Sequence, residues 1–229
     1  MTKRNPILLA IDTTDPVQAG ALADAAGDGV GGIKLGLEFF TANGPEGVRA
    51  VMQGRRKALF LDLKLHDIPN TVAGAVRAVA PLAPALLTVH IAGGGEMLRA
   101  AVEAAPPGTR VVGVTVLTSL DESDLHAVGQ TGPVADQVRR LAVLARTSGL
   151  HGVVCSPKEV RMLRAECGKD FLLVVPGIRP AGADLSDQKR VMGPKEALEE
   201  GADYLVIGRP ITAAADPAAA AQAIFRSIG

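Results

Sequence analysis

The fold of this chain is decided by the stretch ALFLDLKLHDIPNT, which occupies residues 58–71. It begins with four apolar residues, as a buried strand does, and after them leucine alternates with a polar or charged residue. Side chains two positions apart on a strand share a face. We therefore predict that the three leucines face one side of the strand and that Asp62, Lys64 and His66 face the other.

The strand is expected to end before Pro69, because proline lacks the N–H that a central strand needs and restricts the residue before it. Asp67 is in phase with the leucines, but it falls in the turn and is free to point elsewhere. Alternation alone also fits an edge strand with one solvated face, which is common in antiparallel sheets. In a parallel barrel, however, a charged strand face looks into the mouth, where charges are costly unless they are paired or used. Clustered titratable groups there favour an active site.

The rest of the chain favours that barrel. Short apolar runs at seven further places predict strands, each followed by a helical stretch. They are residues 7–12, 31–36, 86–91, 111–118, 152–156, 171–175 and 204–209, and with the opening stretch they make eight units. Strict alternation of strands and helices implies a parallel sheet, and eight such units close into a barrel. No shift in composition marks a boundary, so we predict a single α/β domain, a (β/α)8 TIM barrel spanning residues 1–229.

Composition excludes several classes of function. Lys plus Arg and Asp plus Glu number 24 each, which gives no general attraction to nucleic acid or to anionic membranes. The chain has no Trp and one Tyr, so stacking platforms for single-stranded nucleic acid are not expected. No apolar stretch reaches membrane-spanning length, and the run after Lys3 and Arg4 is too short for a signal peptide. We expect a cytoplasmic protein in which Cys155 and Cys167 stay reduced.

Polar side chains gather at one place in the predicted barrel. They lie at or near the carboxyl ends of the strands, the face on which barrel enzymes carry their active sites. These residues are Asp12, Lys34, Asp62, Lys64, His90, Thr118, Arg179 and Arg209.

The ends of the last two strands predict a phosphate site. Arg179 follows Gly177 and Arg209 follows Gly208, in the loops that hold phosphate in many barrels. Glycine lets backbone N–H groups approach an anion, and arginine offers a planar fork to its oxygens. The alternatives are a surface salt bridge for Arg179 and a helix cap for Arg209. Residues 180–193 between these strands are long for a connection, which suggests a lid.

Several motifs in this order resemble one enzyme family. They are D-x-K-x-x-D-I-P-N-T at residues 62–71, V-H-x-A-G-G at 89–94, P-G-I-R-P at 176–180, D-Q-x-R at 187–190 and G-R-P-I-T at 208–212. Together they resemble the bacterial type of orotidine 5′-phosphate decarboxylase, and the resemblance covers the whole chain. Ile91 and Met192-Gly193 depart from the family pattern without touching a functional position.

The resemblance implies a homodimer of barrels that converts orotidine 5′-phosphate to UMP and CO₂ in pyrimidine biosynthesis, without metal or organic cofactor. It implies that Lys64 donates a proton to C6 and that Asp62 lies beside the substrate carboxylate, with Asp67 completing the catalytic set. Asp67, Ile68 and Thr71 would reach into the partner subunit's site.

The remaining positions carried over from the family bind substrate. Asp12 and Lys34 resemble its ribose and charge-network positions, and Thr118 resembles the residue that contacts the pyrimidine ring. The phosphate grip would consist of Arg179, Gln188, Arg209 and the backbone of Gly208.

Two alternatives remain open from the sequence. Magnesium-dependent sugar-phosphate decarboxylases and aldolases share the barrel and the D-x-K-x-x-D motif of residues 62–67, but an acid helps to bind their metal where this chain has Lys34. His66 and His90 are possible metal ligands as well as ordinary core or turn histidines. The second alternative is a silent sugar-phosphate sensor, which would not need Asp62, Lys64 and Asp67.

Overall fold

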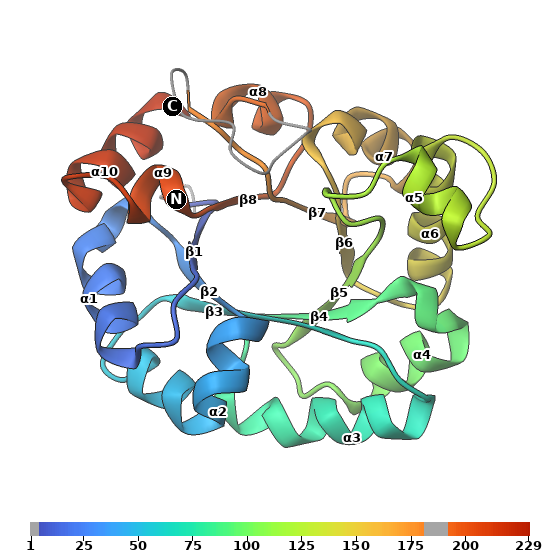
Figure 1. Cartoon of the computed structure of the whole chain (residues 1–229), viewed down its shortest axis with the longest axis horizontal. Coiled ribbons are helices and arrows are strands. Elements are labelled where there is room, and N and C mark those ends of the chain that lie inside the picture. The colour runs from blue at the N-terminus through green and yellow to red at the C-terminus, as the bar shows by residue number, and fades with distance from the viewer. Residues whose placement is uncertain (1–4, 181–191) are drawn as a thin grey trace.

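The computed structural model describes residues 5–180 and 192–229, and in these ranges eight parallel strands pair in sequence order and close into a barrel (Figure 1). The strands are β1 (Ile7–Ile11), β2 (Gly32–Gly36), β3 (Ala58–Leu65), β4 (Leu86–His90), β5 (Arg110–Val114), β6 (Gly152–Val154), β7 (Leu172–Val175) and β8 (Tyr204–Ile207). The predicted (β/α)8 fold is confirmed.

Helices form a ring around the strands (Figure 1). They are α1 (Pro16–Ala26), α2 (Leu37–Met52), α3 (Pro69–Val79), α4 (Gly94–Ala104), α5 (Glu122–Ala127), α6 (Val134–Thr147), α7 (Val160–Cys167), α8 (Pro194–Glu199), α9 (Arg209–Thr212) and α10 (Pro217–Ser227). Helix α1 is capped at its start, because the Asp15 side chain accepts a hydrogen bond from Val17 N–H and proline occupies the first turn. Gly44 interrupts the helical conformation of α2 just before Pro45.

Alternation along each strand separates two apolar regions. On β1, Ile7, Leu9 and Ile11 pack outward against the helices, whereas Leu8 and Ala10 point inward. The inward side chains of the barrel form one cluster, made of Leu8, Ala10, Phe60, Leu86, Val112, Val174, Tyr204 and Val206. We call these eight residues the apolar plug. The barrel interior is therefore a packed core up to the level of the plug.

Strand β3 departs from regular pairing in its second half. Leu61 pairs with Leu87 and Leu65 pairs with Val89, so β3 advances four residues while β4 advances two. Lys64 lies within this bulge and has a φ of 49°. The left-handed region is uncommon for a residue with a side chain, and it re-aims the strand next to the barrel mouth.

Strand β5 is shorter than its apolar run predicts. It ends at Val114, and the Thr115 hydroxyl donates a hydrogen bond of 2.9 Å to the Val154 carbonyl. A threonine side chain that bonds the neighbouring backbone competes with regular strand pairing. The residues up to Thr118 therefore form part of the loop at the barrel mouth rather than of the strand.

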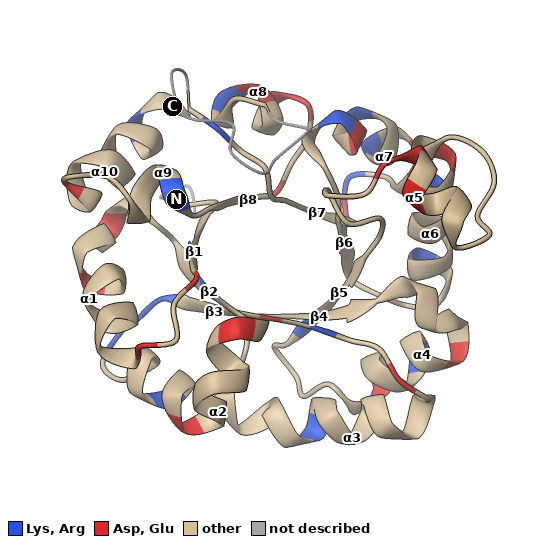
Figure 2. Cartoon of the chain, viewed as in Figure 1, with Lys and Arg blue, Asp and Glu red and all other residues tan. Residues whose placement is uncertain are grey.

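Charged side chains of both signs are interspersed around the outer helices (Figure 2). Cys155 and Cys167 are buried and not joined by a disulfide. Burial raises the pKa of the Cys167 thiol above its ordinary value, which favours the protonated form. Within residues 5–180 and 192–229, every helix is too short or too polar to traverse a lipid bilayer.

Candidate active site

A pocket of about 260 Å³ opens at the carboxyl ends of the strands, directly above the apolar plug. Seven of the eight polar residues that the sequence places at this face line the pocket: Asp12, Lys34, Asp62, Lys64, Thr118, Arg179 and Arg209. Gly208 also lines it. The prediction that these residues gather at one face is therefore confirmed for seven of them, and His90 is the exception.

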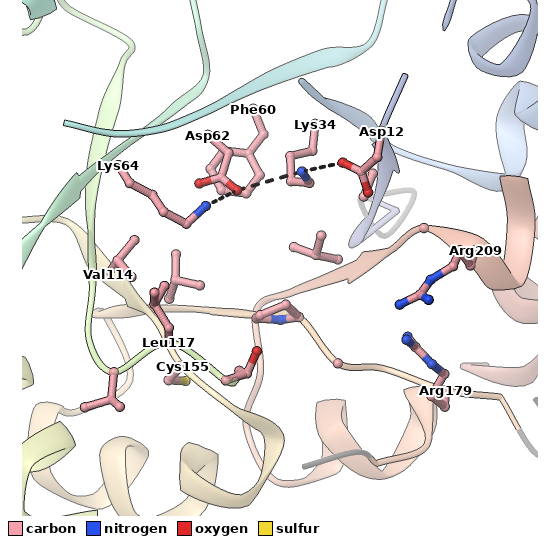
Figure 3. A pocket seen from close by; sticks show the side chains of 18 residues that line it. Asp12, Lys34, Phe60, Asp62, Lys64, Val114, Leu117, Cys155, Arg179 and Arg209 are labelled. Carbon is pink, nitrogen blue, oxygen red and sulfur yellow. Dashed lines mark hydrogen bonds and ion pairs between the residues drawn. The ribbon is translucent and has the colours of Figure 1, made fainter. Parts of the chain in front are cut away.

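Four charged side chains form a row of alternating sign along one wall of the pocket (Figure 3). Lys64 Nζ lies 2.8 Å from Asp62 Oδ2, and Lys34 Nζ lies 3.8 Å from the same oxygen. Lys34 Nζ is also 3.4 Å from Asp12 Oδ1. We call Asp12, Lys34, Asp62 and Lys64 the charge row.

The inner members of the charge row are largely withdrawn from water. The side chains of Lys34 and Asp62 are 11% and 14% exposed, whereas those of Lys64 and Asp12 are 29% and 64% exposed. Charges this buried are tolerated only when each has opposite charges as partners, and the row supplies them. Lys64 therefore ends the row opposite Asp12, and its ammonium group is paired with the carboxylate of Asp62.

Asp62 has a further partner that sequence reasoning missed. The hydroxyl of Thr88 donates a 2.9 Å hydrogen bond to Asp62 Oδ1, and it accepts a 2.8 Å hydrogen bond from Lys64 N–H. Thr88 is fully buried on β4. The sequence did contain a signal for Thr88. It lies two residues before His90, so both side chains are on the same, inward face of β4, the strand next to β3.

The opposite side of the pocket carries the two arginines. Arg179 follows β7 and Arg209 begins α9 after β8. Their guanidinium groups point toward each other across a gap (Figure 3). Gly177, which precedes Arg179, has a φ of 76°, so the turn after β7 uses a conformation that favours glycine. Gln188 and most of the predicted lid, residues 180–193, lie outside the described residues.

Asp67 does not complete the row in a single chain. Within one chain Lys64 pairs with Asp62, while Asp67 Oδ1 accepts a 2.6 Å hydrogen bond from Ile68 N–H, and the role of Asp67 in the partner subunit's site stays a prediction. Asp67, Ile68 and Thr71 are exposed and do not line the pocket, and Ile68 is 66% exposed. The turn before α3 carries Asp67 and Ile68, and the first turn of α3 carries Thr71; the departure of Asp67 from the strand agrees with the sequence prediction.

His66 does not line the pocket with Asp62 and Lys64, so the prediction that all three face the same side of the strand is wrong for His66. The bulge in β3 ends the alternation, and the His66 ring stacks on His90 with 5.3 Å between ring centroids. His90 Nδ1 accepts a 3.3 Å hydrogen bond from Ala92 N–H, which makes it a turn histidine. Burial, and then the nearby positive potential of His66 and Lys64, lowers the pKa of His90 below its ordinary value.

The lysine in the middle of the charge row disfavours metal binding there. In the described parts of the chain, no three His, Cys, Asp or Glu side chains gather in a way that could hold a metal ion. Lys34 occupies the space between the carboxylates of Asp12 and Asp62, and its ammonium group would repel a cation there.

Comparison with known proteins identifies the family. Residues 5–224 match the orotidine 5′-phosphate decarboxylase / HUMPS family. The chain is 59% identical to the orotidine 5′-phosphate decarboxylase of Rhodospirillum rubrum, over 98% of this chain and 94% of that protein. It is also 59% identical to the enzyme of that name from Thermobifida fusca, over 96% of this chain and 94% of that protein.

A solved structure agrees with these relatives. The crystal structure of orotidine 5′-phosphate decarboxylase from Lactobacillus acidophilus superimposes with a TM-score of 0.86 at 38% identity, covering 98% of this chain and 99% of that one. The family resemblance read from the sequence motifs is confirmed.

Proposed function

The chain belongs to the orotidine 5′-phosphate decarboxylase / HUMPS family and is a carboxy-lyase, and from this premise we propose that it converts orotidine 5′-phosphate to UMP and CO₂ with Lys64 as the proton donor. The observation that carries this proposal is one pocket with the charge row on one wall and two arginines on the other. The row suits a reacting centre that develops negative charge, and the arginines suit a phosphate.

The reaction breaks the bond between C6 and the carboxylate carbon. The carboxylate leaves as CO₂ and its bonding electron pair stays on C6, so the site must stabilise a carbanion that has little resonance relief. A fixed ammonium group is suited to this task because it needs no reorganisation at the moment of reaction. The Lys64 ammonium then transfers one proton to C6, which gives UMP and leaves a neutral amine that solvent reprotonates.

Asp62 and the other members of the row hold that ammonium in place. With Oδ2 bonded to Lys64 at 2.8 Å, the Asp62 carboxylate fixes the direction from which the proton is delivered. A substrate carboxylate beside Asp62 would be repelled, and departure of CO₂ would relieve that repulsion. Lys34 and Asp12 extend the row toward the ribose, and Thr118 borders the space for the pyrimidine ring.

Arg179 and Arg209, with the Gly208 backbone, form the phosphate grip in this proposal, and Gln188 belongs to it as well. Phosphate contacts lie far from the reacting carbon, so their binding energy can be used to hold the ring against the charge row. This arrangement would make the phosphate important for turnover as well as for affinity.

The proposal includes a homodimer in which each subunit contributes Asp67, Ile68 and Thr71 to its partner's site. The exposure of these residues in one chain, and above all of the apolar Ile68 side chain, supports it. Mixing Asp67→Ala with Lys64→Ala protein tests the idea, because a heterodimer would hold one intact site. We expect random mixing to restore about a quarter of wild-type activity. Verified heterodimers without activity would mean that each site is self-contained.

The magnesium-dependent branch of the same family is the alternative. The ammonium group of Lys34 between Asp12 and Asp62 argues against it. The deciding experiment follows the loss of orotidine 5′-phosphate absorbance with protein stripped of metal by exhaustive chelation. We expect full turnover after chelation. Turnover that vanishes and returns with Mg²⁺ would favour the alternative, and tight binding of the nucleotide without turnover would favour a sensor.

A further inference from the structure

We propose that Thr88 is a positioning residue for this reaction, acting through Asp62 and Lys64 rather than on the substrate. The inference rests on the proposed function, because it concerns the orientation of that function's charge row. Thr88 does not line the pocket and none of its surface is exposed, so a bound ligand would not touch it. Its hydroxyl nonetheless contacts both residues that lie nearest the reacting centre.

The direction of each hydrogen bond follows from the chemistry of the donors. Backbone N–H can only donate, so the Lys64 N–H must use a lone pair of the Thr88 hydroxyl. The single hydroxyl proton is then left for Asp62 Oδ1, 2.9 Å away. A hydroxyl that donates to a carboxylate makes a charge-assisted hydrogen bond, which is stronger than a neutral one.

This bond determines which carboxylate oxygen faces the pocket. With Oδ1 held by Thr88, Oδ2 is left to contact Lys64 at 2.8 Å and Lys34 at 3.8 Å. Rotation of the carboxylate would break the bond to Thr88 and disturb both ion pairs. Thr88 thereby sets the orientation of the group that aims the Lys64 ammonium.

The same hydroxyl supports the unusual backbone of Lys64. Pairing between β3 and β4 is interrupted between Leu61 and Leu65, and Lys64 has a φ of 49° inside that gap. A buried N–H without a partner is costly, and the Thr88 hydroxyl supplies the partner that the sheet does not. One side chain on β4 therefore holds both the backbone and the counter-charge of Lys64.

The test compares Thr88→Val, which keeps the shape but removes the hydroxyl, with Thr88→Ser, which keeps the hydroxyl. Loss of hydrogen bonds to a charged group predicts a fall in kcat of about 10- to 100-fold for Thr88→Val, with KM changed less than about threefold. Thr88→Ser should keep most of the wild-type kcat. Thr88→Ala also removes the hydroxyl, so the same fall in kcat is expected, and it replaces Thr88→Val in the test if the valine variant does not fold.

Thr109→Val is the matched control, because Thr109 is also buried and its hydroxyl donates to the Pro84 carbonyl at 2.7 Å, away from the pocket. It should lower thermal stability and leave kcat unchanged. A folded Thr88→Val protein with wild-type kcat would overturn the inference, as would a serine variant as slow as the valine variant. Absence of turnover in the wild-type protein would instead overturn the proposed function, so the two failures are distinguishable.

Discussion

The apolar plug and the charge row lie next to each other along β1 and β3, but the plug fills the barrel interior and the row lines the pocket. On β1, Ala10 belongs to the plug and Asp12 follows two residues later; on β3, Phe60 and Asp62 stand in the same relation. The plug fills the barrel interior and contributes hydrophobic burial. The row carries buried charges that are unfavourable unless paired, and these are the groups suited to chemistry. On each of these strands, a residue that stabilises the barrel is thus only two positions away from a residue proposed to act on substrate.

The largest effect on turnover is expected at Lys64, the last residue of the charge row. Lys64→Ala removes the proposed proton donor and the charge that stabilises the carbanion, so we expect kcat to fall by at least about 10⁴-fold, or about 5 kcal/mol of barrier. Steady-state turnover measures it. Lys57→Ala is the matched control, because Lys57 is another partly buried lysine, paired with Asp28 outside the pocket. It should turn over normally, and near-normal turnover of Lys64→Ala would reject the proposed role.

A substitution in the apolar plug should lower stability and leave turnover almost unchanged. Leu8 is 1% exposed in the plug and does not line the pocket. Leu8→Ala is expected to lower the free energy of unfolding by about 2–5 kcal/mol through lost burial and a residual cavity. Urea denaturation measures that loss, and kcat at low temperature should stay within about twofold of wild type. A large loss of kcat in a stable Leu8→Ala protein would mean that the two layers are not separable.

On the far side of the pocket, Arg209→Ala should act on phosphate alone. Loss of a charge-assisted contact is expected to weaken UMP binding about 10- to 100-fold and to leave uridine binding almost unchanged. Calorimetric titration with both ligands gives the comparison. Arg226→Ala on α10 is the control, since Arg226 does not line the pocket. Equal losses for UMP and uridine would count against the phosphate grip.

The smallest effect is expected at His90, beside the row. The folded protein lowers the pKa of His90, chiefly by burial. Protonation is therefore easier in the unfolded chain, and the stability that the neutral ring contributes is present above the unfolded pKa of about 6.5 and lost as pH falls through the lower folded value. We expect His90→Asn, whose amide oxygen can replace Nδ1 as acceptor, to lose less stability than wild type between pH 7 and pH 5. Urea midpoints at both pH values test this, and identical losses would contradict it.

The sequence predicts the barrel and most of the charge row for simple physical reasons. Apolar runs followed by helical stretches leave few alternatives to a closed parallel sheet, and polar residues at strand ends must then meet at one face. The convergence of Asp12, Lys34 and Asp62 from three different strands needs only that topology. Alternation also places Leu61 and Leu63 correctly in the outer core.

The features that escaped prediction depend on pairing between strands. The β3 bulge places Lys64 in a left-handed conformation and sends His66 to stack on His90, and no local pattern in residues 58–71 marks two extra residues. Thr88 reads as one polar residue in an apolar strand, and its role emerges only from the register of β4 beside that bulge. Strand periodicity predicts only that Asp67 leaves the strand at the turn, and it does not specify the direction in which the side chain then points.

Exchange of the C6 proton of UMP with solvent deuterium tests the central claim most directly, because a lysine that protonates C6 must also be able to remove that proton. The exchange is followed by nuclear magnetic resonance with wild-type protein and with Lys64→Ala. We expect the wild-type protein to exchange the C6 proton and the Lys64→Ala protein to do so no faster than buffer alone. Equal exchange by both proteins would contradict the assignment of Lys64 as the proton donor.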